Sequence, residues 1–434
     1  MSGALPATIG NLSGLTFLAL NWNSLTGDIP SSIGNLTNLT LLDLSFNHLT
    51  SIPATIGNLI HLERLELSTN NLTGQIPATL GNLASLKFLT LSYNQLQGSI
   101  PSTLGDLSNT NLLSLDLSNN QLSGPIPGSL GNLSALNNLY LNSNHLSGTV
   151  PSALKNLTRL GAFHIFDNEL TDTFPSDLIE AGNLGGLLMQ DNHFTFTSLE
   201  PLAQIAVLYA PQHSIALHKK ADSLFSVSAG GTLTNNTYHL YKDGNLIAEK
   251  SGDSTFVIRS PGQYYITVTN TVATALTLYS DTVAVPDTAF LCPPASGATL
   301  SARFVAGLYQ WQVDSGNGFV NLRNNEHYSG VDFHDLTLSN IPSSWYGYQY
   351  RCVGNSGNSN IYILKFADKW VGGVTNDWEN PSNWSCGTLP DINTDVVIED
   401  GNVVLSSNRS CRTLTVKSGA SLTVKTGVIL TITH

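Results

Sequence analysis

Charged side chains are scarce in this chain of 434 residues. Only 11% are Asp, Glu, Lys or Arg, against about 25% in an average soluble protein. The formal net charge of −12 comes from 30 acidic and 18 basic residues, and the only adjacent basic pair is Lys219–Lys220. Binding to phosphates needs clustered Lys and Arg, so the composition argues against a nucleic-acid partner.

Long apolar runs are also missing. None approaches the ~18 residues of a membrane helix, and no basic-then-apolar leader opens the chain. Met1 instead stands directly inside a repeat, and His434 follows a strand-like run. We therefore expect a fragment of a longer protein, whose signal peptide and C-terminal sorting region lie outside it, and no membrane insertion of this part.

The sequence lacks the motifs of common catalytic sites. It contains no His-Glu-x-x-His, no Gly-x-Ser-x-Gly and no Walker loop. The Asp-Gly-Asn triplets at 243–245 and 400–402 do not continue into calcium loops, and turns explain them. His164 lies close to Asp167, a spacing typical of a surface hydrogen bond. We predict that the chain is not an enzyme and binds no cofactor or metal.

Cysteine is rare and confined to the last third of the chain, at Cys292, Cys352, Cys386 and Cys411. No two form a Cys-x-x-Cys motif, which gives zinc binding no support. An even number in a Ser/Thr-rich β context favours disulfides and an oxidising compartment. Three pairings are possible. Our expectation is the sequential one, Cys292–Cys352 with Cys386–Cys411, and the alternative is four buried free thiols.

The first half of the chain repeats one motif eight times, mostly at steps of 24 residues. Its leading leucines are Leu15, Leu39, Leu62, Leu86, Leu112, Leu136, Leu160 and Leu184. Each unit follows L-x-x-L-x-L-x-x-N-x-L-x-G-x-I-P-x-x-I/L-G-N. This pattern resembles the leucine-rich repeat, and its G-x-I-P half resembles the plant-type subclass. The resemblance implies a solenoid over residues 1–211 with an irregular last coil as its cap.

Elementary geometry accounts for the motif. Leu89 and Leu91 alternate along a short strand, so both point to one side. The amide of Asn94 can pair with backbone groups where the chain turns, and a column of such amides does so in every coil. Pro101 fixes φ and starts a short helical return. The stacked coils then share one core that a single coil cannot bury.

The resemblance implies a parallel sheet on the concave face with short helical or irregular returns, so residues between the strand leucines are expected to point outward on that face. Outward aromatics are a functional hint, because the core does not need them; the alternative is an inert scaffold whose aromatics shield strand ends. We predict a ligand surface on this face and at its strand ends, made of Phe17, Trp22, Asp43, Phe46, Arg64, Glu66, Phe88, Tyr93, Asp116, Tyr140 and His164.

After the solenoid the period changes to alternating strands broken by turns. Residues 212–287 resemble an immunoglobulin-like β-sandwich without cysteine, in which Val227, Leu240 and Ile266 take the places of the usual cysteines and tryptophan. Tyr264 fits the tyrosine corner of that fold, where the hydroxyl bonds to a nearby loop.

Residues 288–366 resemble the bacterial immunoglobulin-like modules of Bacteroidetes surface proteins. In this comparison Trp311 is the core tryptophan, and Tyr350 stands two residues before Cys352. Cys292 lies ahead of the expected second strand, so a bridge to Cys352 would tie the entry of the domain to its sixth strand.

Residues 367–434 resemble a module of secreted Bacteroidetes adhesins, truncated here. Short strand-like runs separated by glycine predict the start of a β-solenoid. Trp370, Trp378 and Trp384 are expected to plug its open end, and the alternative is that they stack on sugar rings.

These patterns together predict a secreted or cell-surface protein that binds an extracellular protein or polysaccharide through the concave face, with the sandwiches as spacers. Two alternatives stay open. The chain could be the non-catalytic, substrate-gripping region of a larger secreted hydrolase, or a structural or ice-contacting surface protein. The fold alone does not choose among them.

Overall fold

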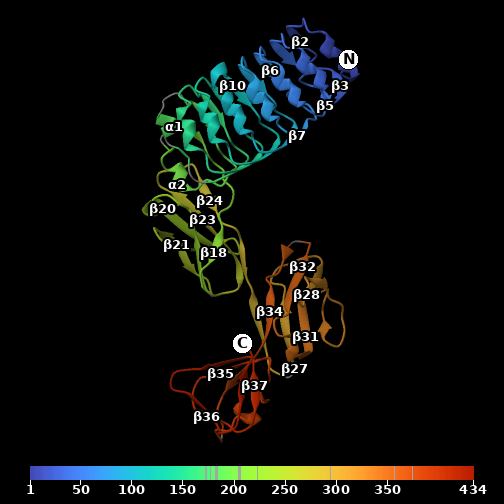
Figure 1. Ribbon diagram of the computed structural model, residues 1–434. Helices are drawn as coiled ribbons and strands as arrows, with labels where there is room; N and C mark the ends of the chain where they lie inside the picture. Colours follow the sequence, from blue (N-terminus) through green and yellow to red (C-terminus); the bar gives the residue numbers. More distant parts are fainter. Residues whose placement is uncertain are drawn as a thin grey trace. The chain divides into compact units, whose positions relative to one another are not determined.

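The computed structural model describes residues 1–434 except 172–173, 176, 181–183, 204–206, 222, 294, 356 and 374, and describes no side chain at 108–110, 180, 295 or 296. The chain forms two compact units. Figure 1 draws the chain from the N-terminal solenoid, in blue and green, to the C-terminal strands, in red. The first comprises Met1–Tyr241, Leu246–Val257 and Tyr265–Asp281. The second comprises Lys242–Asn245, Ile258–Tyr264 and Thr282–His434.

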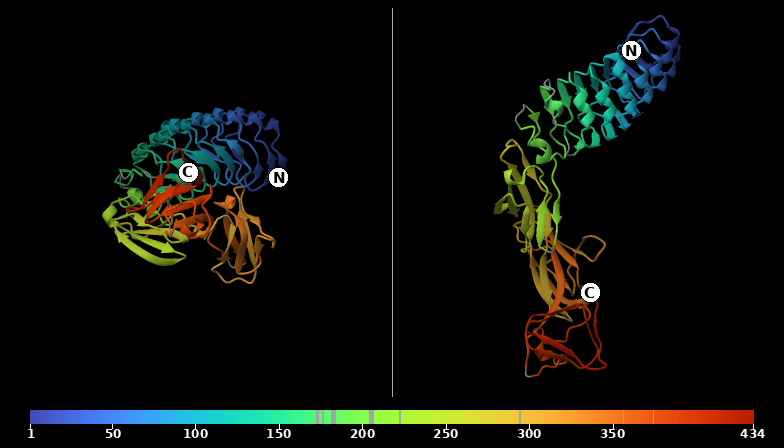
Figure 2. Two further views of the ribbon diagram at one scale, coloured as in Figure 1. Left: turned by 90° about the horizontal axis from the view of Figure 1, so that it is seen from below. Right: turned by 60° about the vertical axis from the view of Figure 1, so that its left-hand side comes forward.

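The first unit begins with a solenoid whose coils stack side by side (Figure 2). One parallel nine-stranded sheet follows the coils in order. Its strands are β2 (Phe17–Ala19), β4 (Leu41–Asp43), β6 (Arg64–Glu66), β8 (Phe88–Thr90), β10 (Ser114–Asp116), β12 (Asn138–Tyr140), β14 (Ala162–His164), β16 (Gly186–Leu188) and β17 (Val207–Leu208).

Two further layers complete each coil. Short strands form parallel ladders of their own: β1 (Ser2–Ala4), β3 (Ser24–Gly27), β5 (His48–Leu49), β7 (Thr73–Gln75), β9 (Gln95–Gly98), β11 (Gln121–Gly124), β13 (His145–Gly148) and β15 (Glu169–Leu170). The returns are 3₁₀ helices: η1 (Ala7–Asn11), η2 (Ser31–Asn35), η3 (Ala54–Asn58), η4 (Ala78–Asn82), η5 (Ser102–Thr110), η6 (Gly128–Asn132) and η7 (Ser152–Asn156). Each return follows a proline, as predicted from the repeat.

The predicted asparagine ladder is confirmed. The Oδ1 atom of Asn120 accepts from the Leu96 N–H of the preceding coil at 3.0 Å, and its Nδ2 donates to the Leu91, Leu117 and Ser118 carbonyls at 3.0–3.1 Å. The same four bonds are made by Asn47, Asn70, Asn94, Asn144, Asn168 and Asn192.

The 3₁₀ side of the solenoid is packed so closely that it needs glycine. A Cβ added to Gly81 would lie 2.3 Å from the backbone oxygen of Thr103 in the next coil. Equivalent distances of 2.3–2.4 Å hold at Gly10, Gly34, Gly57, Gly105 and Gly131. Hydroxyls reinforce this contact, because the Thr103 Oγ1 donates to the Ala78 carbonyl at 2.7 Å and four equivalent Ser or Thr hydroxyls do the same at 2.6–2.7 Å.

The end of the solenoid is tied to the β-structure that follows it in the first unit. The last two returns of the solenoid are short α-helices: α1 (Asp177–Glu180) lies between β15 and β16, and α2 (Phe196–Leu199) lies between β16 and β17. Directly after α2, the Glu200 carboxylate accepts from the Thr232 N–H at 3.0 Å and from the Asn270 amide at 2.6 Å. Burial raises the pKa of Glu200, but these hydrogen bonds outweigh it and leave the pKa below its ordinary value.

The following segment forms two sheets. One has antiparallel β18 (Leu217–Lys219), β19 (Leu224–Val227) and β22 (Thr255–Val257), and the other has β21 (Asn245–Ser251), β20 (Asn236–Lys242), β23 (Gly262–Asn270), β24 (Thr277–Tyr279) and β25 (Val283–Val285). A 3₁₀ turn, η8 (Leu233–Asn235), precedes β20. Val227, Leu240 and Ile266 are buried. The Tyr264 hydroxyl donates to the Ser260 carbonyl at 2.7 Å, which confirms the predicted tie of that hydroxyl to a nearby loop.

The second unit contains an eight-stranded mixed sheet and a smaller sheet facing a common core. The large sheet holds β26 (Asp287–Leu291), β28 (Tyr309–Asp314), β29 (Val320–Asn321), β32 (Gln349–Gly354), β33 (Gly357–Asn358), β34 (Tyr362–Trp370), β35 (Thr394–Ile398) and β38 (Thr413–Val416). The small one holds β27 (Ala295–Ser301), β30 (Tyr328–Ser329) and β31 (Asp335–Pro342), followed by η9 (Ser343–Trp345). Trp311 is fully buried in this core, as predicted.

Parallel pairing dominates the end of the second unit. Beyond β34, β35 and β38, strand β36 (Asn402–Leu405) pairs with β39 (Ser421–Val424) and β37 (Arg409–Cys411) with β40 (Leu430–Ile432), all in parallel. Trp370, Trp378 and Trp384 are at most 4% exposed, and the short helix η10 (Pro381–Asn383) lies between the last two. Buried rings leave no face for a sugar, which supports the plug and speaks against the sugar-stacking alternative.

The expected cysteine pairing is wrong. A disulfide joins Cys292 to Cys386, with 5.4 Å between their Cα atoms, and Cys352 and Cys411 are buried free thiols. The sequential pairing assumed one bridge per domain. In the structure β34 pairs with β26 on one part of its length and with β35 on another, which brings the ends of these segments together. The bridge therefore connects two of the predicted domains, 288–366 and 367–434.

In the part of the chain that the structure describes, no helix has both the length and the apolar character needed to cross a membrane.

Replacing Gly81 by Ala should destabilise the solenoid by about 1–3 kcal/mol, because the new Cβ would meet backbone that can move only by separating two coils. Hydrogen exchange should then accelerate in the amides of η4 and η5. The matched control is Gly14→Ala, where a Cβ meets nothing within 4 Å, and its exchange should equal that of the wild type. Equal protection in the two variants would contradict the packing described here.

The cysteine assignment can be checked by peptide mapping. Alkylation of the unfolded but unreduced protein should label Cys352 and Cys411, and digestion should release one peptide pair linked through Cys292 and Cys386. The folded protein should react slowly, because burial raises the pKa of the Cys411 thiol to about 11 and that of Cys352 in the same direction. A linked Cys292–Cys352 peptide would overturn the assignment.

Candidate functional site

The predicted ligand residues lie on the strands of the nine-stranded sheet of the solenoid or just beyond the strand ends. Strand register aligns one column from Phe17 through Arg64 and Phe88 to Gly186, and a second from Ala19 through Asp43, Glu66 and Asp116 to Leu188. The inward leucines between the columns, such as Leu42, Leu65 and Leu89, are fully buried. The sequence therefore placed the outward residues of the strands correctly.

A third column stands where each strand ends, and it holds an uncommon backbone conformation. All eight residues have φ of 53–57°: Trp22, Phe46, Thr69, Tyr93, Asn119, Ser143, Asp167 and Asp191. Non-glycine residues rarely adopt this left-handed region, least of all aromatic or β-branched ones. Sequence reasoning located the column but missed its backbone conformation, which turns the chain so that the next residue, the ladder asparagine, points inward.

The aromatic end of the face is built from this third column and the first strand. The Trp22 and Phe46 rings are stacked, with centroids 3.7 Å apart and planes inclined by 8°. Trp22 is still 71% exposed, and Tyr93, two coils beyond Phe46, is 61% exposed. Phe17 adds a ring that is 58% exposed on the first strand. Apolar rings held in place while facing water supply contact area at little entropic cost.

The charged centre of the face lies on β4, β6, β8 and β10. The Arg64 guanidinium contacts the Glu66 carboxylate at 3.1 Å and covers the Phe88 ring, 4.1 Å from its centroid. Burial raises the pKa of Glu66, while a Thr90 hydrogen bond and the Arg64 charge oppose that rise and the neighbouring Asp43 adds to it. The stacking of Arg64 on Phe88 was not predicted, although the two residues stand in one column.

Two aspartates of the second column, Asp43 and Asp116, are oriented by hydrogen bonds within the turns that follow them. The Asp43 Oδ1 accepts from the Ser45 N–H at 3.0 Å and from its hydroxyl at 2.6 Å. Asp116 makes the same pair of bonds with Ser118, at 3.0 and 2.7 Å. A carboxylate held through one oxygen keeps the other free to accept a hydrogen bond from a ligand.

Besides the aromatic end and the charged centre, Tyr140 and His164 form a smaller group in the second column. Their rings are 4.8 Å apart, and Phe166 lies 6.3 Å beyond the imidazole. Burial lowers the pKa of His164, and the charge of Asp116 opposes this shift. The structure thus gathers the predicted residues into three groups along one face: an aromatic end, a charged centre and the Tyr140–His164 pair.

Comparisons with known proteins agree with the solenoid. Residues 2–176 match a leucine-rich repeat region family, which confirms the predicted repeat over those residues. Residues 369–434 match a domain of unknown function (DUF8693). A comparison with curated proteins finds no match.

Solved structures with similarity to the chain include plant receptor ectodomains. One is the leucine-rich repeat ectodomain of the membrane receptor kinase GASSHO1/SCHENGEN3 from Arabidopsis thaliana in complex with CASPARIAN STRIP INTEGRITY FACTOR 2, with 31% identity over 50% of this chain and 30% of that one and a TM-score of 0.45. Another is the Arabidopsis receptor kinase HAESA in complex with the peptide hormone IDA and the co-receptor SERK1, with 33% identity over 50% and 37% and a TM-score of 0.45.

A third similar structure is a plant ice-binding protein, with 28% identity over 49% of this chain and 67% of that one and a TM-score of 0.41. This chain spans about a third of the length of the two receptor ectodomains. All three TM-scores lie below 0.5, so nothing about the ligand of this chain follows from them.

The raised pKa of Glu66 gives the solenoid a pH dependence. Because the folded state favours the protonated carboxyl, its contribution to stability is fully present below the ordinary pKa of 4.5 and is lost as the pH rises through the folded value. As the pH rises from 4.5 to 7, the melting temperature of Glu66→Gln should therefore fall less than that of the wild type.

The control for the loss of one negative charge is Glu63→Gln, since Glu63 stands on the same coil in an exposed pair with Lys87 at 2.9 Å. Thermal melts across the pH range measure the effect. Identical pH profiles for Glu66→Gln and the wild type would contradict the burial effect.

Proposed function

We propose that this chain is an extracellular recognition protein whose concave solenoid face binds an extended segment of a protein ligand carrying basic and apolar side chains. One observation supports this most: the exposed Trp22–Phe46 stack and the carboxylate-bearing charged centre belong to columns of the same face. The core requires none of these side chains, so their presence there calls for an external partner.

The charge of the face favours a basic segment. Asp43, Glu66 and Asp116 bring three carboxyl groups to the centre, and Arg64 is paired with one of them. A Lys or Arg of the ligand would meet oriented oxygens there, and such complementarity sets register and association rate. An extended segment lying along the columns would reach both the centre and the aromatic end, where its apolar side chains would cover the rings.

The rest of the chain is assigned to presentation. We place the two β-structured regions, 212–287 and 288–366, as immunoglobulin-like spacers and 367–434 as an adhesin-type module of a secreted or cell-surface protein resembling those of Bacteroidetes. The Cys292–Cys386 bridge supports an oxidising compartment. The proposal gives the chain no catalysis of its own.

Polysaccharide binding is the second candidate, because the exposed face of the Trp22–Phe46 stack suits a sugar ring. This candidate includes the alternative that the chain is the non-catalytic substrate-binding region of a larger secreted hydrolase. Ice contact is less favoured. The hydroxyl column of the 3₁₀ side donates its protons to backbone carbonyls, and the concave columns mix aromatic and charged residues.

A binding screen with matched variants tests this. The whole chain is applied to arrays of extracellular proteins and of glycans, beside a variant with Phe17, Trp22, Phe46 and Tyr93 changed to Ala. We expect binding to basic protein targets that the variant weakens at least ~100-fold, since hot-spot residues contribute ~1–2 kcal/mol or more each. The control is Leu12→Ala with Ile60→Ala, two exposed apolar residues (54% and 47%) outside the three columns.

The control should bind within ~3-fold of the wild type, as surface changes outside a hot spot do. A variant that binds protein targets as well as the wild type would contradict the assignment to this face. Glycan binding that the variant loses, without protein binding, would replace the first proposal by the second.

A further inference from the structure

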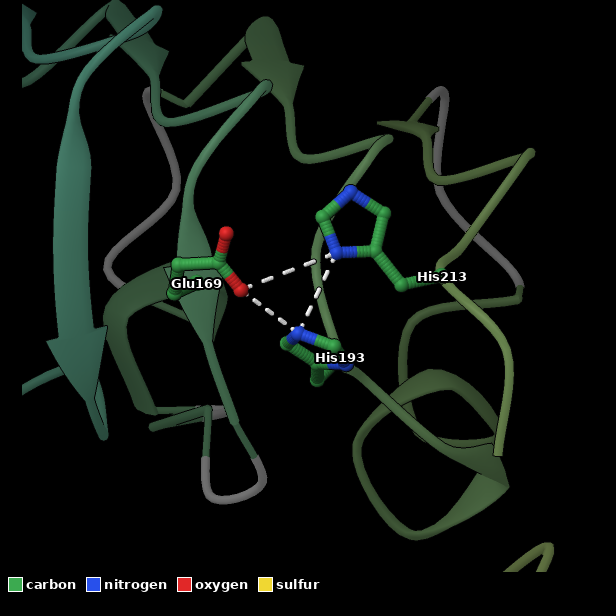
Figure 3. Close-up of side chains that lie close together, drawn as sticks. All are labelled: Glu169, His193 and His213. Carbon is green, nitrogen blue, oxygen red and sulfur yellow. Dashed lines mark hydrogen bonds and ion pairs between the residues drawn. The ribbon is translucent and has the colours of Figure 1, made fainter. Parts of the chain in front are cut away.

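Three side chains of types that can ligate a metal, Glu169, His193 and His213, meet at the C-terminal end of the solenoid and belong to none of the three columns. Figure 3 shows Glu169, His193 and His213 pointing toward one another. The His193 Nε2 lies 2.7 Å from the Glu169 Oε2 and 3.2 Å from the His213 Nδ1, which is 3.9 Å from the same oxygen. All three ligand atoms lie within 4.8 Å of one another.

The repeat itself builds this cluster. Glu169 and His193 each follow a ladder asparagine, Asn168 and Asn192, so they occupy the same position in successive coils. In the last coil Gln212 takes over part of the ladder role, because its Nε2 donates to the Met189 carbonyl at 3.0 Å and its Oε1 accepts from the Phe194 N–H at 3.1 Å. The residue after Gln212 is His213, so three consecutive levels contribute one ligand each.

We propose that Glu169, His193 and His213 bind one divalent transition-metal ion, Zn²⁺ by preference. Ligands at ~2.0–2.1 Å from a tetrahedral zinc are separated by about 3.3 Å. The observed separations of 2.7, 3.2 and 3.9 Å bracket that value. Two imidazole nitrogens and one carboxylate oxygen are donors that zinc accepts, whereas Ca²⁺ and Mg²⁺ require mainly oxygen.

Exposure leaves room for a fourth ligand. The side chains of Glu169, His193 and His213 are 50%, 39% and 36% exposed. Water or a side chain of a bound partner could complete the tetrahedron from the open side.

The position of the site indicates what the metal does. Glu169 lies on β15, and the backbone of His193 forms a parallel bridge with Thr171. The backbone N–H of His213 donates to the Asn192 carbonyl at 2.7 Å. A metal there would join two coils and the exit from the solenoid, where the leucine pattern has decayed. The bland alternative is a trio held by hydrogen bonds alone, which needs no metal.

Zinc titration of the whole, chelator-stripped chain distinguishes the two. Isothermal calorimetry with Zn²⁺ alone should give one ion per chain. His193→Gln and His213→Gln should each weaken zinc binding at least ~100-fold. Loss of a residue that only supports a metal ligand already weakens binding by ~10–100-fold, and loss of a ligand itself should cost at least as much. The matched control is His145→Gln, which changes the exposed residue after the ladder asparagine Asn144 and should bind as the wild type does.

Two further readouts keep the proposal falsifiable if a variant folds poorly. Co²⁺ substituted into the wild type should show the intense visible absorption of tetrahedral coordination, and Ca²⁺ should not compete. Zn²⁺ should raise the melting temperature of the wild type and of His145→Gln but not of His193→Gln. Absence of stoichiometric binding, or equal binding by all four proteins, would overturn the proposal.

Discussion

The hydrogen bonds of the ladder asparagines are the constraint on which the solenoid depends. Where each coil turns away from its strand, backbone groups leave the sheet and would be buried without partners, at about 1–3 kcal/mol each. One primary amide supplies an acceptor and two donors, and at Asn120 these reach backbone groups of its own coil and of the preceding one. Because the same amide recurs in successive coils, it fixes their spacing and register. The close glycine contacts on the 3₁₀ side impose that spacing a second time.

This over-determined scaffold explains why bulky residues tolerate a left-handed backbone at the strand ends. Two consecutive backbone hydrogen bonds tie the turn to the next coil. The Trp22 N–H donates to the Ser45 carbonyl and the Asn23 N–H to the Phe46 carbonyl, both at 3.1 Å. Strain of this kind persists only when surrounding structure enforces it. Its consequence is that Trp22 and Phe46 can be held in a face-to-face stack while the outer ring stays in water. Because the asparagine ladder makes the backbone rigid, the Trp22 and Phe46 rings are already ordered before a ligand binds, which lowers the entropic cost of binding.

The solenoid and its outward columns could be predicted from the sequence, because a fixed period carries the information about the core, the strands and the faces at once. The inward position of Leu89, the ladder position of Asn94 and the outward position of Phe88 follow from the repeat alone, without information about distant residues. The second unit contains no such period. Cys292 and Cys386 are 94 residues apart and meet because β34 pairs on one part of its length with β26 and on another with β35. Pairing of this kind depends on tertiary contacts that local patterns do not encode, so the sequential assignment of the bridges failed. The same limit applies to the Glu200 contacts with Thr232 and Asn270.

Stacking in register also decides which side chains can act together. Motif searches examine neighbours along the chain, and along the chain Glu169 and His193 are unrelated residues of two coils. The solenoid places equivalent positions next to each other, so the relevant neighbours are found by reading down a column. The residue before the ladder asparagine then gives the Trp22–Phe46 stack, and the residue after it gives Glu169 and His193 with 2.7 Å between their polar atoms. One geometric rule therefore generates both an aromatic surface at one end of the solenoid and a cluster of metal ligands at the other, although no motif along the sequence announces either.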